Sequence, residues 1–245
     1  MEPIAYCSPL KDPMPGYQLK LERVQIPGVD DLQIRSLLDR QQYADPDGSA
    51  LRQGVSSGTW PLFGLLWPSG HELACRMARH PLQAGQRILE MGCGLALASL
   101  VGHRRGADVT ATDCHPLAGQ FLRDNLLLNG LLALPYRHGQ WALADEEGQP
   151  YEEVPSAPVL EGRFDVLMGS DLLYERDDGG MLPSFIERHA QPRAQVWLVD
   201  PNRGNRAAFN RRMAALGFDR QEEMLNRTAT PDRPAYAGRF LTYRR

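Results

Sequence analysis

Residues 87 to 113 constrain the fold of this chain most strongly, because two short apolar runs flank a glycine turn and a helical stretch. The first run leads into Gly92-Cys93-Gly94, and the second ends in Asp113. Glycines let backbone N–H groups approach a ligand closely, because no side chain blocks the approach. A carboxylate about 20 residues further on, at the tip of the next strand, is placed to accept hydrogen bonds from the hydroxyls of a ribose. The stretch therefore predicts a strand–turn–helix–strand unit that binds a ribose-bearing cofactor.

Two details of the turn argue against a dinucleotide cofactor. The G-x-G-x-x-G spacing requires a glycine where Leu97 stands, and Glu90 lies near the expected place of a pyrophosphate, which a carboxylate repels. S-adenosylmethionine has a cationic amino-acid end and a ribose. We therefore expect its ammonium near Glu90 and its ribose at Asp113. The alternative is a strand–helix turn with chance glycines, and the matched spacing of the two carboxylates disfavours it.

Composition excludes several function classes. The chain has 245 residues, 42% hydrophobic and 23% charged, with a formal charge of −3, so nucleic-acid binding is not favoured. The four cysteines form no C-x-x-C pair and the six histidines no metal pattern, so we expect no metal. We see no signal peptide and no apolar run of membrane-spanning length, and we therefore expect a cytoplasmic protein that does not bind membranes.

The first 56 residues are predicted to be an N-terminal extension, an extended arm plus a helix. Residues 1–28 are expected to form an extended arm or, as the alternative, short strands such as Tyr17–Leu21. A helix is predicted over residues 30–43, because apolar side chains recur there at helical spacing behind two acidic residues. Residues 57–245 are predicted to form the main domain.

The rest of the chain alternates between strand and helix patterns. Strands are predicted at 87–91, 107–112, 164–169, 194–199, 219–225 and 238–244, and a further strand is predicted to end near residue 141. Helices are predicted at 72–79, 95–105, 116–129, 179–190 and 204–216. This alternation implies a parallel sheet with helices on both faces, and ligands of such sheets bind at the carboxyl ends of the strands. Asp113, Trp141, Ser170–Tyr174 and Asp200 all fall at those ends.

The segment before the first strand carries two further signals. Ser69-Gly-His-Glu72 has the spacing of a helix capping box. Trp67 lies just before that helix and could cover the sulfonium of the cofactor, because aromatic faces attract cations. A core tryptophan is an equal alternative for Trp67. Trp141 is expected to stack on adenine, with a buried core tryptophan as the alternative.

Asp171 and Tyr174 are the candidate catalytic residues. They follow the fourth strand, beside the first, where a methyl donor should point. Methyl transfer needs a neutral nucleophile held in line with the methyl group. The Asp171 carboxylate can align an amine by accepting one N–H, and Tyr174 can add a contact or an aromatic wall. The alternatives are a helix N-cap for Asp171 and a packing residue for Tyr174.

These residues together resemble the seven-β-strand class I of S-adenosylmethionine-dependent methyltransferases, and within it methyltransferase family 16, which contains many protein-lysine methyltransferases. Glu90-Met-Gly-Cys-Gly94 is similar to the first motif of the family, and Asp171-Leu-Leu-Tyr174 matches its D-x-x-Y motif. The resemblance implies a doubly wound, mostly parallel, seven-stranded Rossmann-like α/β sheet whose last strand is antiparallel. The expected cofactor contacts are Trp67, Glu90, Gly92, Cys93, Gly94, Asp113, Trp141 and Ser170.

The sequence thus predicts an enzyme that uses S-adenosyl-L-methionine to methylate a protein side chain, most naturally lysine. A small-molecule methyltransferase on the same fold is the alternative, because fold does not fix substrate. A cofactor-binding module without catalysis is a further alternative. The target protein, the number of methyl groups added and the oligomeric state stay open.

Overall fold

The structure is a computed structural model that describes residues 16–139, 141, 157–174, 176–177, 179–230 and 234–245. Its centre is a seven-stranded sheet in the order β5-β4-β3-β6-β7-β9-β8. The strands are β3 (Arg87–Met91), β4 (Asp108–Asp113), β5 (Tyr136–His138), β6 (Phe164–Ser170), β7 (Ala190–Asp200), β8 (Asp219–Arg227) and β9 (Tyr236–Arg244). All neighbouring pairs are parallel except that β9 is antiparallel to both β7 and β8. The predicted mostly parallel sheet is confirmed, and so is its antiparallel last strand.

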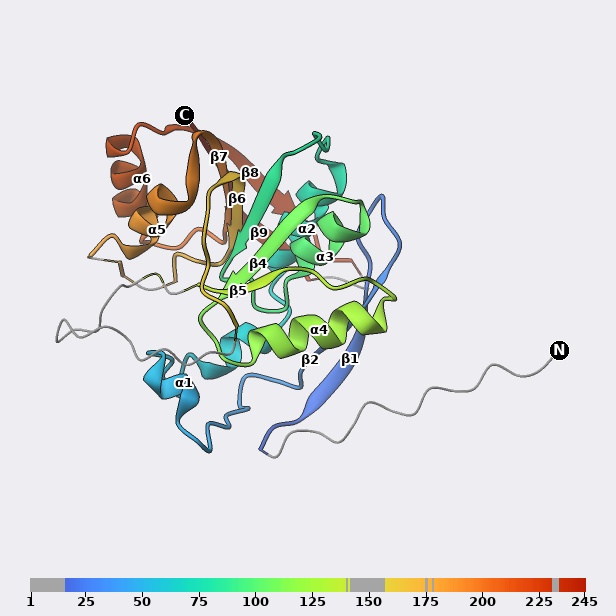
Figure 1. Cartoon of the computed structure of the whole chain (residues 1–245). Helices are drawn as coiled ribbons and strands as arrows, with labels where there is room; N and C mark the ends of the chain where they lie inside the picture. The colour runs from blue at the N-terminus through green and yellow to red at the C-terminus, as the bar shows by residue number, and fades with distance from the viewer. Residues whose placement is uncertain (1–15, 140, 142–156, 175, 178, 231–233) are drawn as a thin grey trace.

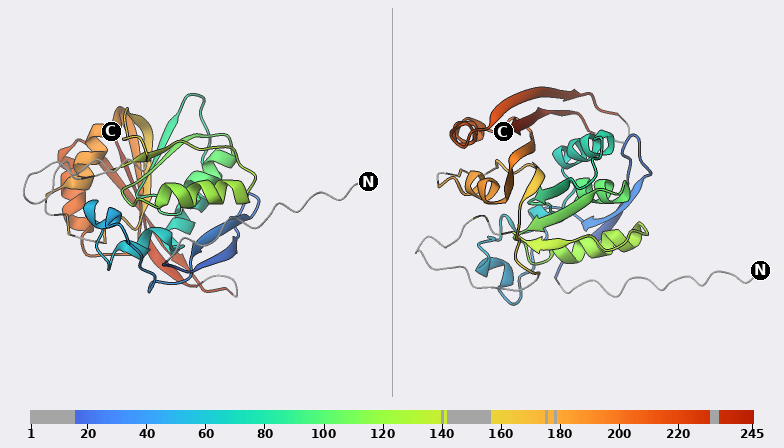
Figure 2. Two further views of the ribbon diagram at one scale, coloured as in Figure 1. Left: turned by 60° about the horizontal axis from the view of Figure 1, so that its bottom comes forward. Right: turned by 45° about the horizontal axis from the view of Figure 1, so that its top comes forward.

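Helices cover both faces of the sheet (Figures 1 and 2). One face carries α2 (Pro68–Arg79), α3 (Leu97–Arg104) and α4 (Ala118–Leu128), and the other carries α5 (Met181–His189) and α6 (Arg206–Ala215). Successive residues of a strand point to opposite faces. Ile88 of β3 accordingly joins the core under α2–α4, whereas Leu89 joins the core under α5 and α6. The central strands are buried on both sides, as parallel strands with crossover helices must be.

The helix predicted over residues 30–43 is wrong. Residues Leu32–Leu37 form strand β2, which pairs antiparallel with β1 (Leu19–Val24) in a separate two-stranded sheet. Leu32, Ile34 and Ser36 are fully buried and alternate with partly exposed residues, which is the period of a strand. The strand expected near Tyr17–Leu21 is present as β1. The remaining short elements are α1 (Ser49–Arg52) and the 3₁₀ turn η1 (Trp60–Gly64).

Two asparagine side chains of α4 fasten this hairpin to the main sheet domain. Asn129 accepts a hydrogen bond from the Gln33 N–H at 2.9 Å and donates one to the Gln33 carbonyl at 2.8 Å. Asn125 accepts from the Arg35 N–H at 2.7 Å and donates to the Arg35 carbonyl at 3.3 Å. The amides therefore bond the free edge of β2 as a neighbouring strand would, and the edge is not left without partners.

The capping box predicted at Ser69 is also wrong. Helix α2 begins at Pro68, so Ser69 lies inside the helix and not at its N-cap. Trp67 is the N-cap residue, and its side chain makes no capping hydrogen bond. Proline suits the first helical position because its missing N–H is not needed there. The Ser69 hydroxyl is buried and lies 2.9 Å from the Tyr236 hydroxyl of β9. The stretch 143–162 is rich in proline and acidic residues, which predicts a polar loop or insertion, and it falls mostly outside the described residues. The division of the chain at residue 56 stays a prediction.

Candidate active site

The turn after β3 has the backbone conformation that the glycines suggested. Gly92 and Gly94 have φ values of 53° and 52°, in the left-handed region. A Cβ at Gly94 would lie 2.7 Å from the Phe63 carbonyl oxygen, and a Cβ at Gly92 would lie 2.7 Å from a methyl group of Leu172. Ala96 shares the left-handed conformation at φ 57° and is the N-cap of α3. The turn is therefore tight and free of side chains where two other segments approach it.

Asp113 ends β4 beside this turn, as predicted. Its Oδ2 accepts the Gly94 N–H at 2.8 Å, and its Oδ1 accepts the His115 N–H at 2.9 Å. Burial raises the pKa of Asp113, while the backbone hydrogen bonds from His115 and Gly94 oppose that rise. Asp113 is 8% exposed as a residue, and both of its carboxylate oxygens accept backbone hydrogen bonds.

Glu90 lies on the α3 side of β3 and is 3% exposed. Its Oε2 accepts the Ser99 N–H at 2.8 Å and also the Ser99 hydroxyl. Burial raises the pKa of Glu90 to about 7, with the Ser99 bonds lowering it and the charge of Asp113 adding to it. Because the charge of Asp113 acts on the Glu90 carboxyl, the two carboxylates share one electrostatic environment.

Cys93 and Trp141 complete the surroundings of the turn. The Cys93 N–H donates to the Thr112 carbonyl at 3.0 Å, and burial raises the pKa of its thiol. Trp141 is partly buried, and a Cβ at Gly92 would lie 3.5 Å from its ring. The structure therefore brings Trp141 to the same turn as the predicted cofactor residues, although the two are far apart in sequence.

Trp67 stands apart from this group. Its indole N–H donates to the Leu62 carbonyl at 2.8 Å, and the Arg40 guanidinium lies 4.8 Å from its ring centroid. The ring is thus already in contact with a cation from this chain. The assignment of Trp67 to the cofactor stays a prediction.

Ser170 ends β6, and Asp171 follows in a strained conformation. Ser170 pairs with Val199, and a Cβ at Gly70 would lie 3.4 Å from its hydroxyl. Asp171 has φ 59°, which an L-residue adopts only at a cost of about 1–2 kcal/mol. Its N–H donates to the Val199 carbonyl at 3.0 Å, and it is not a helix N-cap, because α5 begins after Gly180. Within the described residues, its buried Oδ2 has no hydrogen-bond partner.

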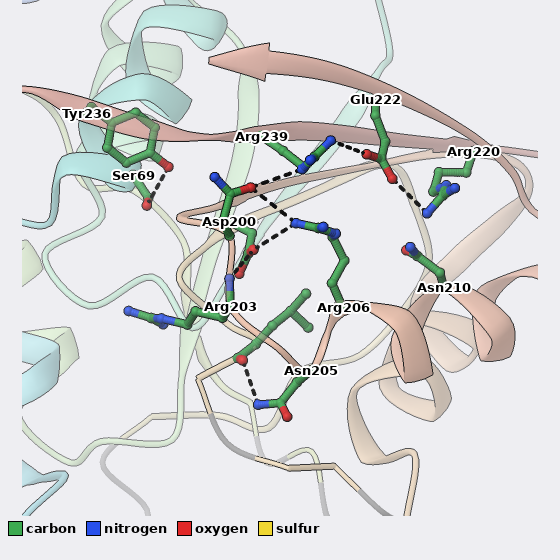
Figure 3. A network of polar contacts seen from close by, with 12 residues as sticks. Ser69, Asp200, Arg203, Asn205, Arg206, Asn210, Arg220, Glu222, Tyr236 and Arg239 are labelled. Carbon is green, nitrogen blue, oxygen red and sulfur yellow. Dashed lines mark hydrogen bonds and ion pairs between the residues drawn. The ribbon is translucent and has the colours of Figure 1, made fainter. Parts of the chain in front are cut away.

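Arg203, which the sequence did not single out, contacts Asp171 twice. One guanidinium nitrogen lies 2.8 Å from Oδ1 of Asp171, and the other donates to its backbone carbonyl at 3.0 Å. The Arg203 N–H in turn donates to Oδ2 of Asp200 at 2.9 Å. Figure 3 shows Arg203 and Arg206 meeting at this carboxylate. The carboxyl ends of β6 and β7 are therefore joined by one arginine.

Tyr174 is 45% exposed, with the Arg203 guanidinium 6.0 Å from its ring centroid. It lines a cavity of about 320 Å³ between the loop after β6 and helices α5 and α6. The walls of this cavity are mainly apolar: Trp141, Leu172, Leu173, Met181, Leu182, Ala207, Ala208 and Phe209. Tyr174 is thus not a core packing residue but stands at the opening of an apolar recess.

The acidic stretch after Tyr174 has a structural role where it is described. The Asp177 carboxylate accepts the N–H groups of Met181 and Leu182 at 2.7 and 3.0 Å, which caps the start of α5. Glu175 and Asp178 lie outside the described residues. In the part of the chain that is described, no group of histidine, cysteine or acidic residues is arranged to hold a metal ion. Among the described helices, none is long and apolar enough to cross a bilayer.

The sequence also missed an aromatic group beside the turn. The Phe63 ring stacks on His115 with centroids 3.7 Å apart, and Trp60 contacts both rings edge-on. Burial lowers the pKa of His115 to about 3, so its ring is neutral. The only sequence signal for this group was the density of aromatic residues over 57–70.

Similarity to known proteins agrees with this arrangement. No protein-family model matches the chain. It is 25% identical over 146 residues to the electron transfer flavoprotein beta subunit lysine methyltransferase of Xenopus laevis, covering 58% of this chain and 53% of that protein. It is 26% identical over 200 residues to the ubiquinone biosynthesis O-methyltransferase of Sodalis glossinidius, covering 79% and 73%. The magnesium protoporphyrin IX methyltransferase of Synechocystis, solved with bound SAH, superposes with a TM-score of 0.51 at 18% identity, covering 72% and 81%.

The chain has the fold of the seven-β-strand class I of S-adenosylmethionine-dependent methyltransferases, as its sequence predicted. The similarity to a lysine methyltransferase agrees with the resemblance to methyltransferase family 16. The chain spans about half the length of the lysine methyltransferases that it matches.

Proposed function

We propose that this chain binds S-adenosylmethionine at the turn after β3 and transfers its methyl group to a lysine side chain of a protein. The observation that carries the proposal is the contact between Leu172 and Gly92. Leu172 directly follows Asp171, so the contact sets the D-x-x-Y segment against the cofactor turn. An amine aligned by Asp171 then lies beside a methyl donor held over the glycines.

The residues present suit this cofactor. The turn at Gly92 and Gly94 carries no side chain, so its backbone is open to close approach, and Leu172, Trp141 and Phe63 pack directly against it. Glu90 is proposed to bind the ligand ammonium, and Asp113 is proposed to accept hydrogen bonds from the ribose hydroxyls. Trp141 is proposed to cover the adenine, while Cys93 and Ser170 line the same edge of the sheet. Neither carboxylate suits the pyrophosphate of a dinucleotide.

When bound, the cofactor would supply a methyl group on a sulfonium. Attack of the neutral lysine amine on that methyl carbon would break the C–S bond, leaving a methylated ammonium and the neutral thioether SAH. The amine must first lose a proton, since a free lysine titrates near ~10.4. Asp171 is proposed to accept one N–H of the neutral amine and so to direct its lone pair at the methyl group. Tyr174, at the opening of the apolar recess, is proposed to form one wall of the lysine channel.

A small-molecule methyltransferase is the second candidate. The similarity to an O-methyltransferase covers more of this chain than the similarity to the lysine methyltransferases does. The recess beside Tyr174 has room for an apolar small molecule as well as for a substrate side chain. The feature that favours a lysine amine as the substrate is Asp171-Leu-Leu-Tyr174, because the Asp171 carboxylate can accept a hydrogen bond from an N–H group.

Incubation with methyl-labelled cofactor and a cell lysate tests the proposal. We expect label in discrete protein bands that contain methyl-lysine, and loss of that label with Asp171→Asn. Label confined to the small-molecule fraction would favour the second candidate. Normal cofactor binding without any transfer would instead identify a non-catalytic module and overturn the proposed activity.

A further inference from the structure

The Asp171 carboxylate, at the proposed amine site, forms an ion pair with Arg203. Arg203 contacts both Oδ1 and the backbone carbonyl of Asp171, and the side chains of the pair are 28% and 12% exposed. A charged pair that is largely shielded from water interacts more strongly than one on the open surface. The second carboxylate oxygen, Oδ2, is buried and has no hydrogen-bond partner in the described part of the chain. Arg203 thus holds one oxygen of Asp171, and the Ser69 hydroxyl acts on the same carboxylate; Oδ2 is the oxygen that we assign to the amine.

The backbone of Arg203 is anchored at the end of β7. Its backbone N–H donates to Asp200, whose side chain is 1% exposed and lies 3.7 Å from the Arg206 guanidinium (Figure 3). The left-handed turn at Asp171 is held by the Arg203 contact to its carbonyl and by its own N–H bond to Val199. Removing the guanidinium therefore removes the cation beside Asp171 and one of the two contacts that hold the turn.

Several groups face Asp171 from the surrounding elements. Ser69 comes from α2, Arg203 and Asp200 come from the end of β7, and Tyr236 comes from β9. Burial raises the pKa of Asp171 and the charge of Asp200 adds to the rise, whereas Ser69 and Arg203 lower it. Arg203 is the cation of this set that pairs with the carboxylate directly.

We infer that Arg203 is a positioning residue that neutralises Asp171, so that the site aligns an uncharged amine instead of holding an ammonium ion. The inference rests on the proposed function. An unpaired buried carboxylate would bind the ammonium form tightly and keep its proton in place. The Asp171–Arg203 pair still offers a hydrogen-bond acceptor but carries no net charge. The amine then loses its proton to solvent more easily and its lone pair is free to attack the methyl carbon.

The pH profile of kcat tests this inference. In Arg203→Gln, we expect the acid limb of the profile to move about one pH unit upward, so that kcat falls about tenfold near pH 7.5 and recovers at high pH. Arg203→Lys keeps the charge, and its acid limb should stay within about 0.3 units of the wild type. Arg220→Gln is the matched control, because Arg220 pairs with Glu222 on β8 and does not contact Asp171. Its profile should not move.

Three outcomes overturn the inference. One is an Arg203→Gln profile lowered by the same factor at every pH, which would assign Arg203 a structural role only. Another is an acid limb that moves about one pH unit upward from the wild type in Arg203→Lys, a result that remains decisive if Arg203→Gln does not fold. The third comes from carboxyl ¹³C NMR, which measures the pKa of Asp171 directly. The same Asp171 pKa in Arg203→Gln as in the wild type would contradict the pairing. This NMR readout needs no turnover, so it separates failure of the inference from failure of the proposed activity.

Discussion

The backbone N–H of Gly94 donates to Oδ2 of Asp113 at 2.8 Å, which ties the turn after β3 to the tip of β4. The same turn touches Phe63 of η1 and Leu172 of the D-x-x-Y segment. Four segments that are distant in sequence therefore meet at two glycines. The proposed cofactor site and the proposed amine site therefore lie in one packed unit, and we expect a change at the turn to affect both.

The two glycines should differ in their tolerance of alanine. A Cβ at Gly94 meets a backbone carbonyl, whereas a Cβ at Gly92 meets the end of a flexible leucine side chain. Both variants bear the cost of a left-handed L-residue, about 1–2 kcal/mol. We expect Gly94→Ala to be about 1–2 kcal/mol less stable than Gly92→Ala in urea unfolding, because the backbone at Phe63 must shift to make room for the new Cβ. Equal stability of the two variants would show that η1 does not pack against the turn.

Glu90 should make the stability of the chain depend on pH. Its pKa is raised by burial to about 7 in the folded protein, against 4.5 when exposed. The protonated form is therefore favoured by folding, and the free energy of unfolding should fall as the pH rises from about 4.5 to about 7. The difference corresponds to about 3 kcal/mol. Urea unfolding of the wild type at pH 5 and pH 8 measures it, and Glu90→Gln should remove this part of the pH dependence. A Glu90→Gln curve that parallels the wild type would contradict the burial of an ionisable Glu90.

The hairpin should loosen when Asn129 is removed. Asn129→Ala leaves the Gln33 N–H and carbonyl without their side-chain partner, at a cost of about 2 kcal/mol. Hydrogen exchange of the Gln33 amide should speed up, while cofactor binding at the distant turn should persist. Asn226→Ala is the matched control, since Asn226 is exposed on β8. Unchanged exchange at Gln33 would mean that the asparagine does not fasten β2.

Filling the recess beside Tyr174 should weaken substrate binding but leave cofactor binding unchanged. Ala208 is exposed and lines the recess, so Ala208→Trp should fill part of it without disturbing the core. We expect KM for a protein substrate to rise about tenfold while the affinity for the cofactor stays within twofold. Ala214→Trp, on the same helix but away from the recess, is the control. Equal kinetics of the two variants would show that the substrate does not use the recess.

Local patterns were enough to predict the cofactor turn. Glu90, Gly92, Gly94 and Asp113 lie within one strand–turn–helix–strand unit, so their relative positions follow from the lengths of its elements. The β/α alternation likewise predicted the sheet, since a parallel pair of strands requires a crossover. The helix predicted over 204–216 is also present as α6, and Gly217, the glycine directly after that range, has φ 81° beyond its C-terminal end.

The errors arose where distant partners override a local pattern. Leu32, Ile34 and Leu37 fit a helix as well as a strand, and β1 together with the α4 asparagines decides for the strand. Ser69 has capping spacing, but its hydroxyl is used by a tyrosine 167 residues away. Arg203 looked like one surface charge among many, because its contact with Asp171 depends on how β6 and β7 align. No window of sequence contains these pairs.

Calorimetric titration with S-adenosylmethionine at pH 8 tests the central claim most directly. We predict that the wild type binds it, that NAD⁺ gives no binding heat, and that Asp113→Ala weakens binding about 30-fold through loss of roughly 2 kcal/mol of hydrogen bonding. Asp108→Ala, at the exposed start of the same strand, should bind as the wild type does. A folded Asp113→Ala that binds within twofold of the wild type, or a preference for NAD⁺, would contradict the account.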